Sequence, residues 1–257
     1  MMGFDISLRA AAHVWQRNAT IYRKTFHLNI LPNFFEPFFY LVALGWALGK
    51  HLESVDGRSY LEFIAPGLVA YNAAMGATFE VTYNTFVKMT FSRTYDSVIA
   101  APVSVEDIVV GEVLWGVTRA VIYAAGFLAI ACAMGAIAPG RAFLVLLVTP
   151  LTGALFASLG MIYTAIVPVI DLYSFYYTLF MTPLFLFSGI FFPMRDLPGY
   201  IQEAIVFTPL FHGVRASNEL AWGTEGAGTV ASLVYLVVVS AGLLALAIKM
   251  MKRRLVR

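Results

Sequence analysis

Long apolar segments, separated by short polar stretches, constrain the fold of this chain more than any other feature. A helix rises about 1.5 Å per residue, so about 20 apolar residues cross the hydrocarbon core of a bilayer, which is about 30 Å thick. Of the 257 residues, 60% are hydrophobic and 12% are charged, which is outside the range of soluble proteins. The sequence therefore predicts an all-α integral membrane protein with six transmembrane helices. We expect these spans at residues 31–49, 60–86, 108–134, 141–167, 172–192 and 229–248.

The segment before the first span, residues 1–29, is predicted to form an amphipathic helix at the membrane interface. It has no apolar core of about 7–15 residues after its first charges, which argues against a signal peptide. An ordinary helix on a soluble core is the alternative. On a helical wheel, the apolar face comprises Phe4, Leu8, Ala11, Trp15, Tyr22 and Phe26, and the opposite basic face comprises Arg9, Arg17, Arg23 and Lys24.

The stretch after the fifth span, residues 193–228, contains helix-breaking residues at short intervals. Pro193, Pro198 and Gly199 lie within seven residues, and Pro209 stands inside the apolar run at 200–211. As a helix, that run would reach only about 18 Å, which is too short to cross the membrane. We therefore expect half-helices that enter the membrane and return to the same face. A surface loop with a buried amphipathic helix fits the periodicity equally well.

Three charged residues lie inside predicted spans: Glu80 in the second, and Glu112 and Arg119 in the third. Because Glu112 and Arg119 are seven residues apart, they share a helix face. A lone cation at this depth costs at least about 2.5–3.5 kcal/mol, so Arg119 needs a partner, for which Glu80 and Glu112 are the candidates. We expect a structural ion pair between helices, and the alternative is a contact with a substrate.

The sequence lacks the patterns typical of enzymes and nucleotide-binding proteins. Residues 45–51 superficially resemble a phosphate-binding loop, but only three residues, instead of four, lie between their glycines, and the lysine is followed by histidine. The four histidines are scattered, and no nucleophile elbow is present. We therefore predict no catalytic, cofactor, metal or nucleic-acid site. A stand-alone lipid enzyme and a proton-coupled secondary transporter, each centred on the intramembrane charges, are the alternatives from other classes.

Basic residues outside the spans are distributed unevenly between the two sides of the membrane. Six spans place both termini on one side, and the positive-inside rule then makes that side cytoplasmic. Residues 193–228 consequently face outward. The terminal side collects eleven basic residues: Arg9, Arg17, Arg23, Lys24, Lys88, Arg93, Lys249, Lys252, Arg253, Arg254 and Arg257. The other side has five: Lys50, Arg58, Arg141, Arg195 and Arg215.

Three motifs in the C-terminal half resemble the signature of the ABC-2 type exporter permease family. They are Phe187-Ser-Gly-Ile-Phe-Phe-Pro193, Leu197-Pro198 and Pro209-Leu-Phe-His-Gly-Val-Arg215. The likeness extends along most of the chain, and within the family it is nearest to permeases that export lipo-oligosaccharides. It implies one transmembrane domain over residues 1–257, in which 30–192 carry spans one to five and 229–257 carry span six and a basic tail. The residues of the re-entrant motif are Ser188, Gly189, Pro193, Pro198, Pro209 and Gly213.

The same resemblance implies a permease subunit of an ATP-driven exporter in the bacterial inner membrane. It would form a homodimer, or pair with a similar permease, and work with two separate ABC ATPase subunits that bind ATP and Mg²⁺. The implied substrate is an amphiphile such as a lipid-linked or acylated oligosaccharide, with a drug or another lipid as the alternative. A cytoplasmic helix would couple this chain to the ATPase, although the residues alone indicate a plain loop helix. It comprises Thr94, Tyr95, Asp96, Ser97, Val98, Ile99, Ala100, Ala101 and Pro102.

Overall fold

The computed structural model of the chain describes residues 6–51, 54–99 and 102–256, without the side chains at 27–37, 46, 48, 50, 96, 97 and 99. Throughout these ranges regular structure is helical, apart from an isolated antiparallel bridge between Val55 and Arg58. The predicted all-α class is confirmed. The helices are α1 (Leu8–Tyr40), α2 (Tyr60–Phe79), α3 (Thr94–Ile99), α4 (Val105–Ala133), α5 (Pro139–Ile166), α6 (Tyr173–Phe175), α7 (Thr182–Phe187), α8 (Gly199–Val206), α9 (Pro209–Trp222) and α10 (Ala227–Leu255).

Several helices continue into turns of π or 3-10 geometry, so the rods are longer than the α-helical labels. These segments are Leu41–Leu48 and Gly49–His51 after α1, Glu80–Asn84 and Val87–Phe91 after α2, Ile170–Leu172 before α6, and Tyr176–Met181 between α6 and α7. A separate 3-10 turn, Met194–Asp196, is divided from α8 by extended backbone at Leu197. The second rod therefore runs from Tyr60 to Phe91. We call residues 80–91 its lower end.

Within the described residues, four helical segments are long and apolar enough to cross a membrane. They coincide with the third to sixth predicted spans, and the chain is accordingly a multi-pass membrane protein. The first two predicted spans fall on α1 with its continuation and on α2 with its lower end, which are helical but are not among these four. The four segments are Val105–Ala133, Pro139–Ile166, Ile170–Phe187 and Ala227–Leu255.

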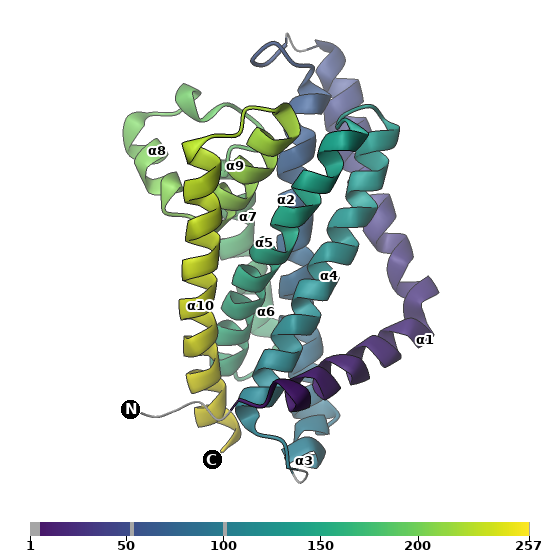
Figure 1. Cartoon of the computed structure of the whole chain (residues 1–257), viewed down its shortest axis with the longest axis vertical. Helices are drawn as coiled ribbons and strands as arrows, with labels where there is room; N and C mark the ends of the chain where they lie inside the picture. Colours follow the sequence, from purple (N-terminus) through teal and green to yellow (C-terminus); the bar gives the residue numbers. More distant parts are fainter. Residues whose placement is uncertain (1–5, 52–53, 100–101, 257) are drawn as a thin grey trace.

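Helix α1 changes direction between its two halves (Figure 1). The first half lies across one end of the bundle beside α4, and the second half climbs along the side. The predicted interfacial helix and first span are therefore one continuous helix. On the predicted apolar face Leu8 and Phe26 are exposed and Ala11 is buried, and Asn18, outside that face, is buried against α4. Phe4 lies outside the described residues.

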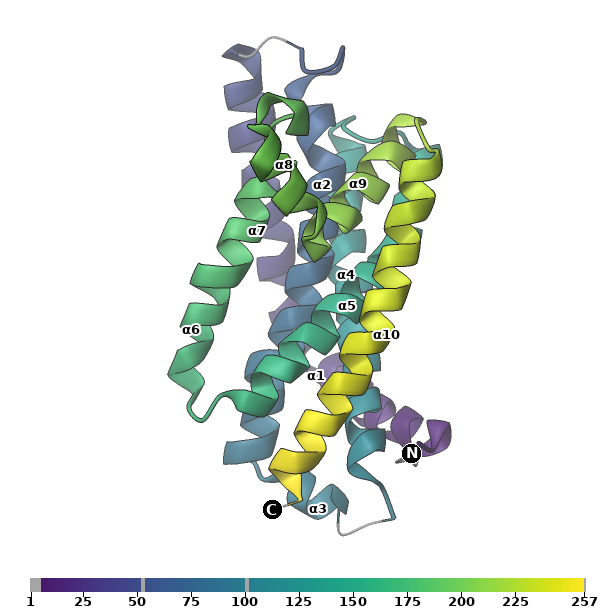
Figure 2. The same cartoon turned by 90° about the vertical axis from the view of Figure 1, so that its left-hand side faces the viewer.

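The two ends of the bundle differ in what they carry (Figure 1, Figure 2). The start of α1, the end of α10 and the short helix α3 gather at one end, and α8 and α9 lie at the other. Helices α6 and α7 form a column at the edge of the bundle, which is clearest in Figure 2. This arrangement separates the predicted coupling segment from the predicted half-helices by the length of the spans.

The fifth predicted span ends five residues early. Helix α7 stops at Phe187 instead of Phe192, and Gly189 has a φ of 84°, which glycine adopts without steric penalty. The chain therefore turns at the Ser188-Gly189 pair. The sixth span is longer than predicted, because α10 continues beyond residue 248 to Leu255.

Helix α9 continues to Trp222 and is terminated by Gly223 at a φ of 74°. Pro209 does not interrupt a helix but occupies the first turn of α9, where its missing N–H has no intrahelical acceptor in any case. With 14 residues, α9 reaches about 21 Å, which is shorter than a hydrocarbon core.

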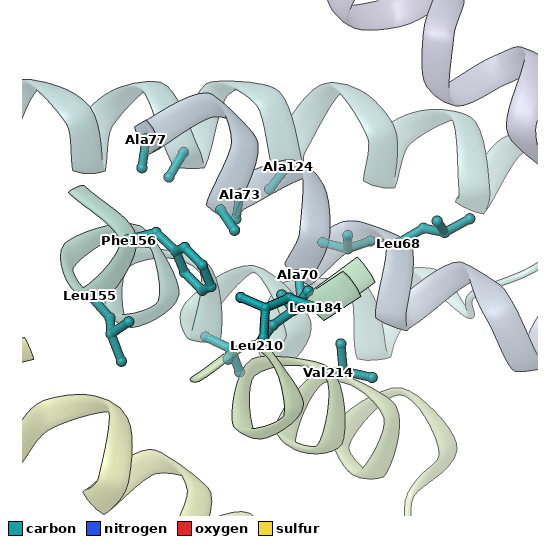
Figure 3. Packing of buried hydrophobic residues seen from close by; sticks show 14 of the residues in the cluster. Leu68, Ala70, Ala73, Ala77, Ala124, Leu155, Phe156, Leu184, Leu210 and Val214 are labelled. Atoms are coloured by element: carbon teal, nitrogen blue, oxygen red, sulfur yellow. The ribbon is translucent and has the colours of Figure 1, made fainter. Parts of the chain in front are cut away.

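Small residues bring α2, α4 and α5 into close contact. Glycines of α5 allow the approach: a Cβ at Gly153 would lie 2.5 Å from the Ala120 Cβ, and one at Gly160 would lie 2.7 Å from Val81 Cγ2. Alanines continue this surface along α2, and Figure 3 shows the Phe156 ring of α5 projecting toward Ala73. Larger side chains at these positions would push the rods apart.

The contact between α1 and α4 gives a first prediction. A Cβ at Gly111 would lie 2.7 Å from the Ala11 carbonyl oxygen and 2.6 Å from the Val14 Cβ, so Gly111→Ala should displace α1. Overpacking of this kind costs about 1–3 kcal/mol. The thermal unfolding midpoint in detergent should fall, whereas Gly140→Ala, at a site with no atom within 4 Å, should leave it unchanged. Equal midpoints for the two variants would contradict the close approach.

Candidate functional site

Five charged side chains from three rods meet near the α3 end of the bundle, and we call them the ionic cluster. They are Arg17 of α1, Glu80 and Lys88 of the lower end of the second rod, and Glu112 and Arg119 of α4. Two of these, Arg17 and Lys88, were assigned from the sequence to the cytoplasmic surface. The structure places them inward instead, because buried carboxylates provide partners for them.

Glu112 is the centre of the cluster and has 0% exposure. Its Oε2 lies 2.8 Å from Lys88 Nζ, and its Oε1 lies 3.1 Å from Arg17 Nη2. The Nδ2 of Asn18 also donates to Oε2, at 3.0 Å. One carboxylate therefore ties α1 and the lower end of the second rod to α4.

Arg119 pairs with Glu80, since its Nε lies 3.6 Å from Glu80 Oε2. The other candidate partner from the sequence, Glu112, binds Arg17 and Lys88 instead. Arg119 is 4% exposed, and its guanidinium lies over the ring of Tyr22, 4.3 Å from the centroid. The expected ion pair between helices is therefore present, with an added cation–π contact to α1.

Hydrogen bonds fix α1 along α4 on both sides of Glu112. Asp107 Oδ1 accepts from the Ser7 backbone N–H at 2.6 Å, and Trp15 Nε1 donates to Thr118 Oγ1 at 2.9 Å. Asp107 can do so because it belongs to a capping box that begins α4. The first half of α1 is thus bonded to α4 at three positions along that helix, so displacing either helix should move the other.

Lys88 lies 3.2 Å from Glu80 and bridges both carboxylates of the cluster. Burying such groups without partners would cost several kcal/mol each, and removing one partner from a buried pair typically costs about 3–5 kcal/mol. The cluster therefore stabilises the relative positions of the three rods chiefly by penalising any separation of its charges.

Residues 94–99 of the predicted coupling segment form helix α3, which is attached to the bundle through a buried side chain. Tyr95 is 1% exposed and packs against Val14 of α1 and Ile108 of α4. Val98 also packs on this group. Tyr95 therefore faces its own chain, since an aromatic side chain flanked by two helices gains more from burial there. The side chains of Asp96, Ser97 and Ile99, and all of Ala100 and Ala101, lie outside the described residues, and Pro102 follows them exposed.

At the opposite end, the motif residues shape turns and close contacts. Ser188 is buried and donates to the Phe185 carbonyl at 3.3 Å, next to the left-handed turn at Gly189. Pro193 and Pro198 precede the short helices that follow them. A Cβ at Gly213 would lie 2.9 Å from Thr152 Oγ1, so glycine lets α9 approach α5.

The comparisons with known proteins agree with this architecture. The family model of the ABC-2 type transporter matches residues 10–220, and the chain therefore belongs to the ABC-2 type transporter family. It is similar to nodulation protein J of Rhizobium meliloti (strain 1021), with 37% identity over 211 residues, 82% of this chain and 80% of that one. Nodulation protein J of Rhizobium leguminosarum bv. trifolii is 39% identical over 201 residues, 78% and 77% of the two chains. The inner membrane transport permease YadH of Escherichia coli (strain K12) is 24% identical over 203 residues, 79% of each chain.

The pairing inside the cluster gives a second prediction. Arg119→Leu should lower the thermal midpoint in detergent, because Glu80 loses a buried partner. Adding Glu80→Gln should recover part of that loss, with a coupling free energy of about 0.5–3 kcal/mol in a double-mutant cycle. Adding Glu112→Gln to Arg119→Leu should lower the midpoint further, since Arg17 then loses its carboxylate and Lys88 loses one of its two. Equal recovery by the two second substitutions would contradict the pairing seen here.

Proposed function

We propose that this chain is the membrane subunit of an ATP-driven exporter whose ATPase is a separate protein. Membership of the ABC-2 type transporter family supports this, and so does the buried ionic cluster that couples α1, α3 and the spans. In this proposal, the partner ABC ATPase binds ATP and Mg²⁺, and this chain binds neither. The chain contributes the membrane path and no hydrolytic chemistry.

The proposed topology has six spans in the bacterial inner membrane. The second half of α1 and the second rod are the first two spans, and the four apolar segments follow. Both termini and α3 are cytoplasmic, and α8 and α9 are re-entrant half-helices on the outer side. The excess of basic residues on the terminal side supports this orientation, as does the short reach of α9.

In the proposed mechanism, ATP binding brings two ATPase subunits together beneath the bundle. This movement of the ATPase subunits displaces the segment Thr94–Ile99, and the contacts of Tyr95 transmit the displacement to α1 and α4. The ionic cluster then carries it to the lower end of the second rod, because separating its charges is costly. Three spans would move as one body and alter the path to the outer half-helices.

We propose a homodimer as the working state, with a path between the two copies. The column of α6 and α7 supports this, since it carries a run of large apolar side chains that face away from the bundle. Leu179, at its centre, is 69% exposed, and Phe175, Leu186 and Phe187 are exposed as well. Lipid covers such a face in a monomer, and a second permease chain would cover it in the dimer.

The proposed substrate is an amphiphile such as a lipid-linked or acylated oligosaccharide. Similarity to several proteins named nodulation protein J supports this choice over a drug or a simple lipid. The experiment is reconstitution of the purified chain with its ATPase in vesicles, followed by transport assays across these three substrate classes. We expect ATP-dependent export only when both proteins are present. Export or ATP hydrolysis by this chain in isolation would contradict the proposal.

The coupling role of α3 gives a third prediction. Ile99→Asp places a charge on the last residue of α3 and should disrupt a contact with the ATPase. Substrate-stimulated ATP hydrolysis in the reconstituted complex should fall at least fivefold, while the amount of inserted chain stays the same. Val169→Asp adds the same charge to an exposed residue in the turn between α5 and α6, and should leave the stimulation intact. Unchanged stimulation in Ile99→Asp would exclude the coupling role.

A further inference from the structure

An open cleft of about 360 Å³ lies beside the ionic cluster, between α1 and the lower end of the second rod. Its inner wall is polar and includes Glu80, Lys88 and Arg119. Ile21 and Val87 also line it, and both are exposed, Ile21 by 56%. The cleft therefore combines a charged interior with exposed apolar side chains, which matches the chemistry of an amphiphile.

The charges of the cluster do not balance. Arg17, Lys88 and Arg119 are three cations, and Glu80 and Glu112 are two carboxylates, which leaves a net charge of +1. Lys88 contacts both carboxylates, so Arg119 shares its partner Glu80 with Lys88. An excess positive charge at a buried site is stabilised by one additional anion.

Arg119 also has hydrogen-bond donors without acceptors. Its Nη2 donates to Tyr123, but its Nη1 and Nε find no acceptor in the described part of the chain, and Nε is 3.6 Å from the Glu80 oxygen. The hydroxyl of Tyr22, which lines the same cleft, is buried and has no hydrogen-bond partner there either. A buried donor left unpaired costs about 1–3 kcal/mol, and more when it is charged. Both groups therefore suit an oxyanion that enters the cleft.

The depth of the cleft favours an anion carried by a lipid. With 29 residues, α4 is about 44 Å long and exceeds the hydrocarbon core by about 14 Å. If that excess lies at the α3 end, where α1 crosses the bundle, Arg119 in the middle of α4 is inside the membrane boundary. A free hydrated anion would have to shed its water to reach it, whereas a lipid headgroup is delivered there by its own chains.

We propose that this cleft binds the anionic headgroup of a membrane phospholipid. Phosphate oxygens accept hydrogen bonds from Arg119 and Tyr22, and the acyl chains lie along Ile21 and Val87. The proposal requires only that the chain is in a membrane, so it stands or falls independently of the proposed transport function.

The test is a titration of the full chain in detergent, followed through tryptophan fluorescence, because Trp115 lines the cleft. The probes are dioctanoyl phosphatidylglycerol, dioctanoyl phosphatidylcholine and inorganic phosphate. We expect saturable binding of one phosphatidylglycerol per chain, at least tenfold tighter than either other probe. Equal affinity for phosphatidylcholine would overturn the recognition of charge, and equal affinity for inorganic phosphate would overturn the assignment to a lipid.

Variants locate the site and separate binding from folding. Arg119→Gln should weaken phosphatidylglycerol binding at least tenfold, whereas Arg253→Gln removes the same charge from the exposed tail and should change it less than twofold. Tyr22→Phe keeps the ring beneath Arg119 and removes only the unpaired hydroxyl, so it tests the site even if Arg119→Gln fails to fold. It should weaken binding about threefold, and Glu80→Gln, which raises the net charge to +2, should tighten it. Equal losses in Arg119→Gln and Arg253→Gln, or no effect of Tyr22→Phe and Glu80→Gln, would overturn the proposal.

Discussion

The fully buried carboxylate of Glu112 is the constraint on which the rest of the structure depends. A carboxylate at this position is tolerated only because Arg17 and Asn18 of α1 and Lys88 of the second rod surround it. The approach of α1 that brings two of these side chains into reach is possible because position 111 is glycine. Charge pairing and close packing thus support each other. Gly111 permits the contact between α1 and α4, and separating the two helices would leave the charges of the cluster without partners.

This arrangement makes the helices at this end of the bundle harder to separate than apolar packing alone would. Apolar surfaces can slide by small steps, but a buried ion pair loses several kcal/mol when its partners separate. Tyr95 joins α3 to the same body through Val14 and Ile108. In the proposed exporter, an ATPase that moves α3 would therefore move α1, α4 and the second rod together. Helix α9, at the opposite end, is joined to this body because it packs on α2 and α5.

The features that the sequence predicted well are local ones. Long apolar runs located the four apolar helical segments that coincide with predicted spans three to six. The cluster was found only in part, because Arg17 and Lys88 reach Glu112 across 95 and 24 residues of chain, and such distances leave no periodic signal. One signal was available, since Lys88 lies eight residues after Glu80 and hence two turns along the same face. The inward direction of Tyr95, and the role of Pro209 as the start of α9, depended on neighbours that only the fold brings together.

The central claim, that Glu112 holds α1 and the second rod as one rigid body, is tested most directly by a distance measurement between them. Spin labels at Thr20 and Thr90, both exposed, would report the separation of the two elements in a Cys132→Ser background. Double electron–electron resonance should give one narrow distance distribution for the otherwise native chain in lipid, and a broad or split one after Glu112→Gln. Distributions of the same width in both proteins would contradict the account.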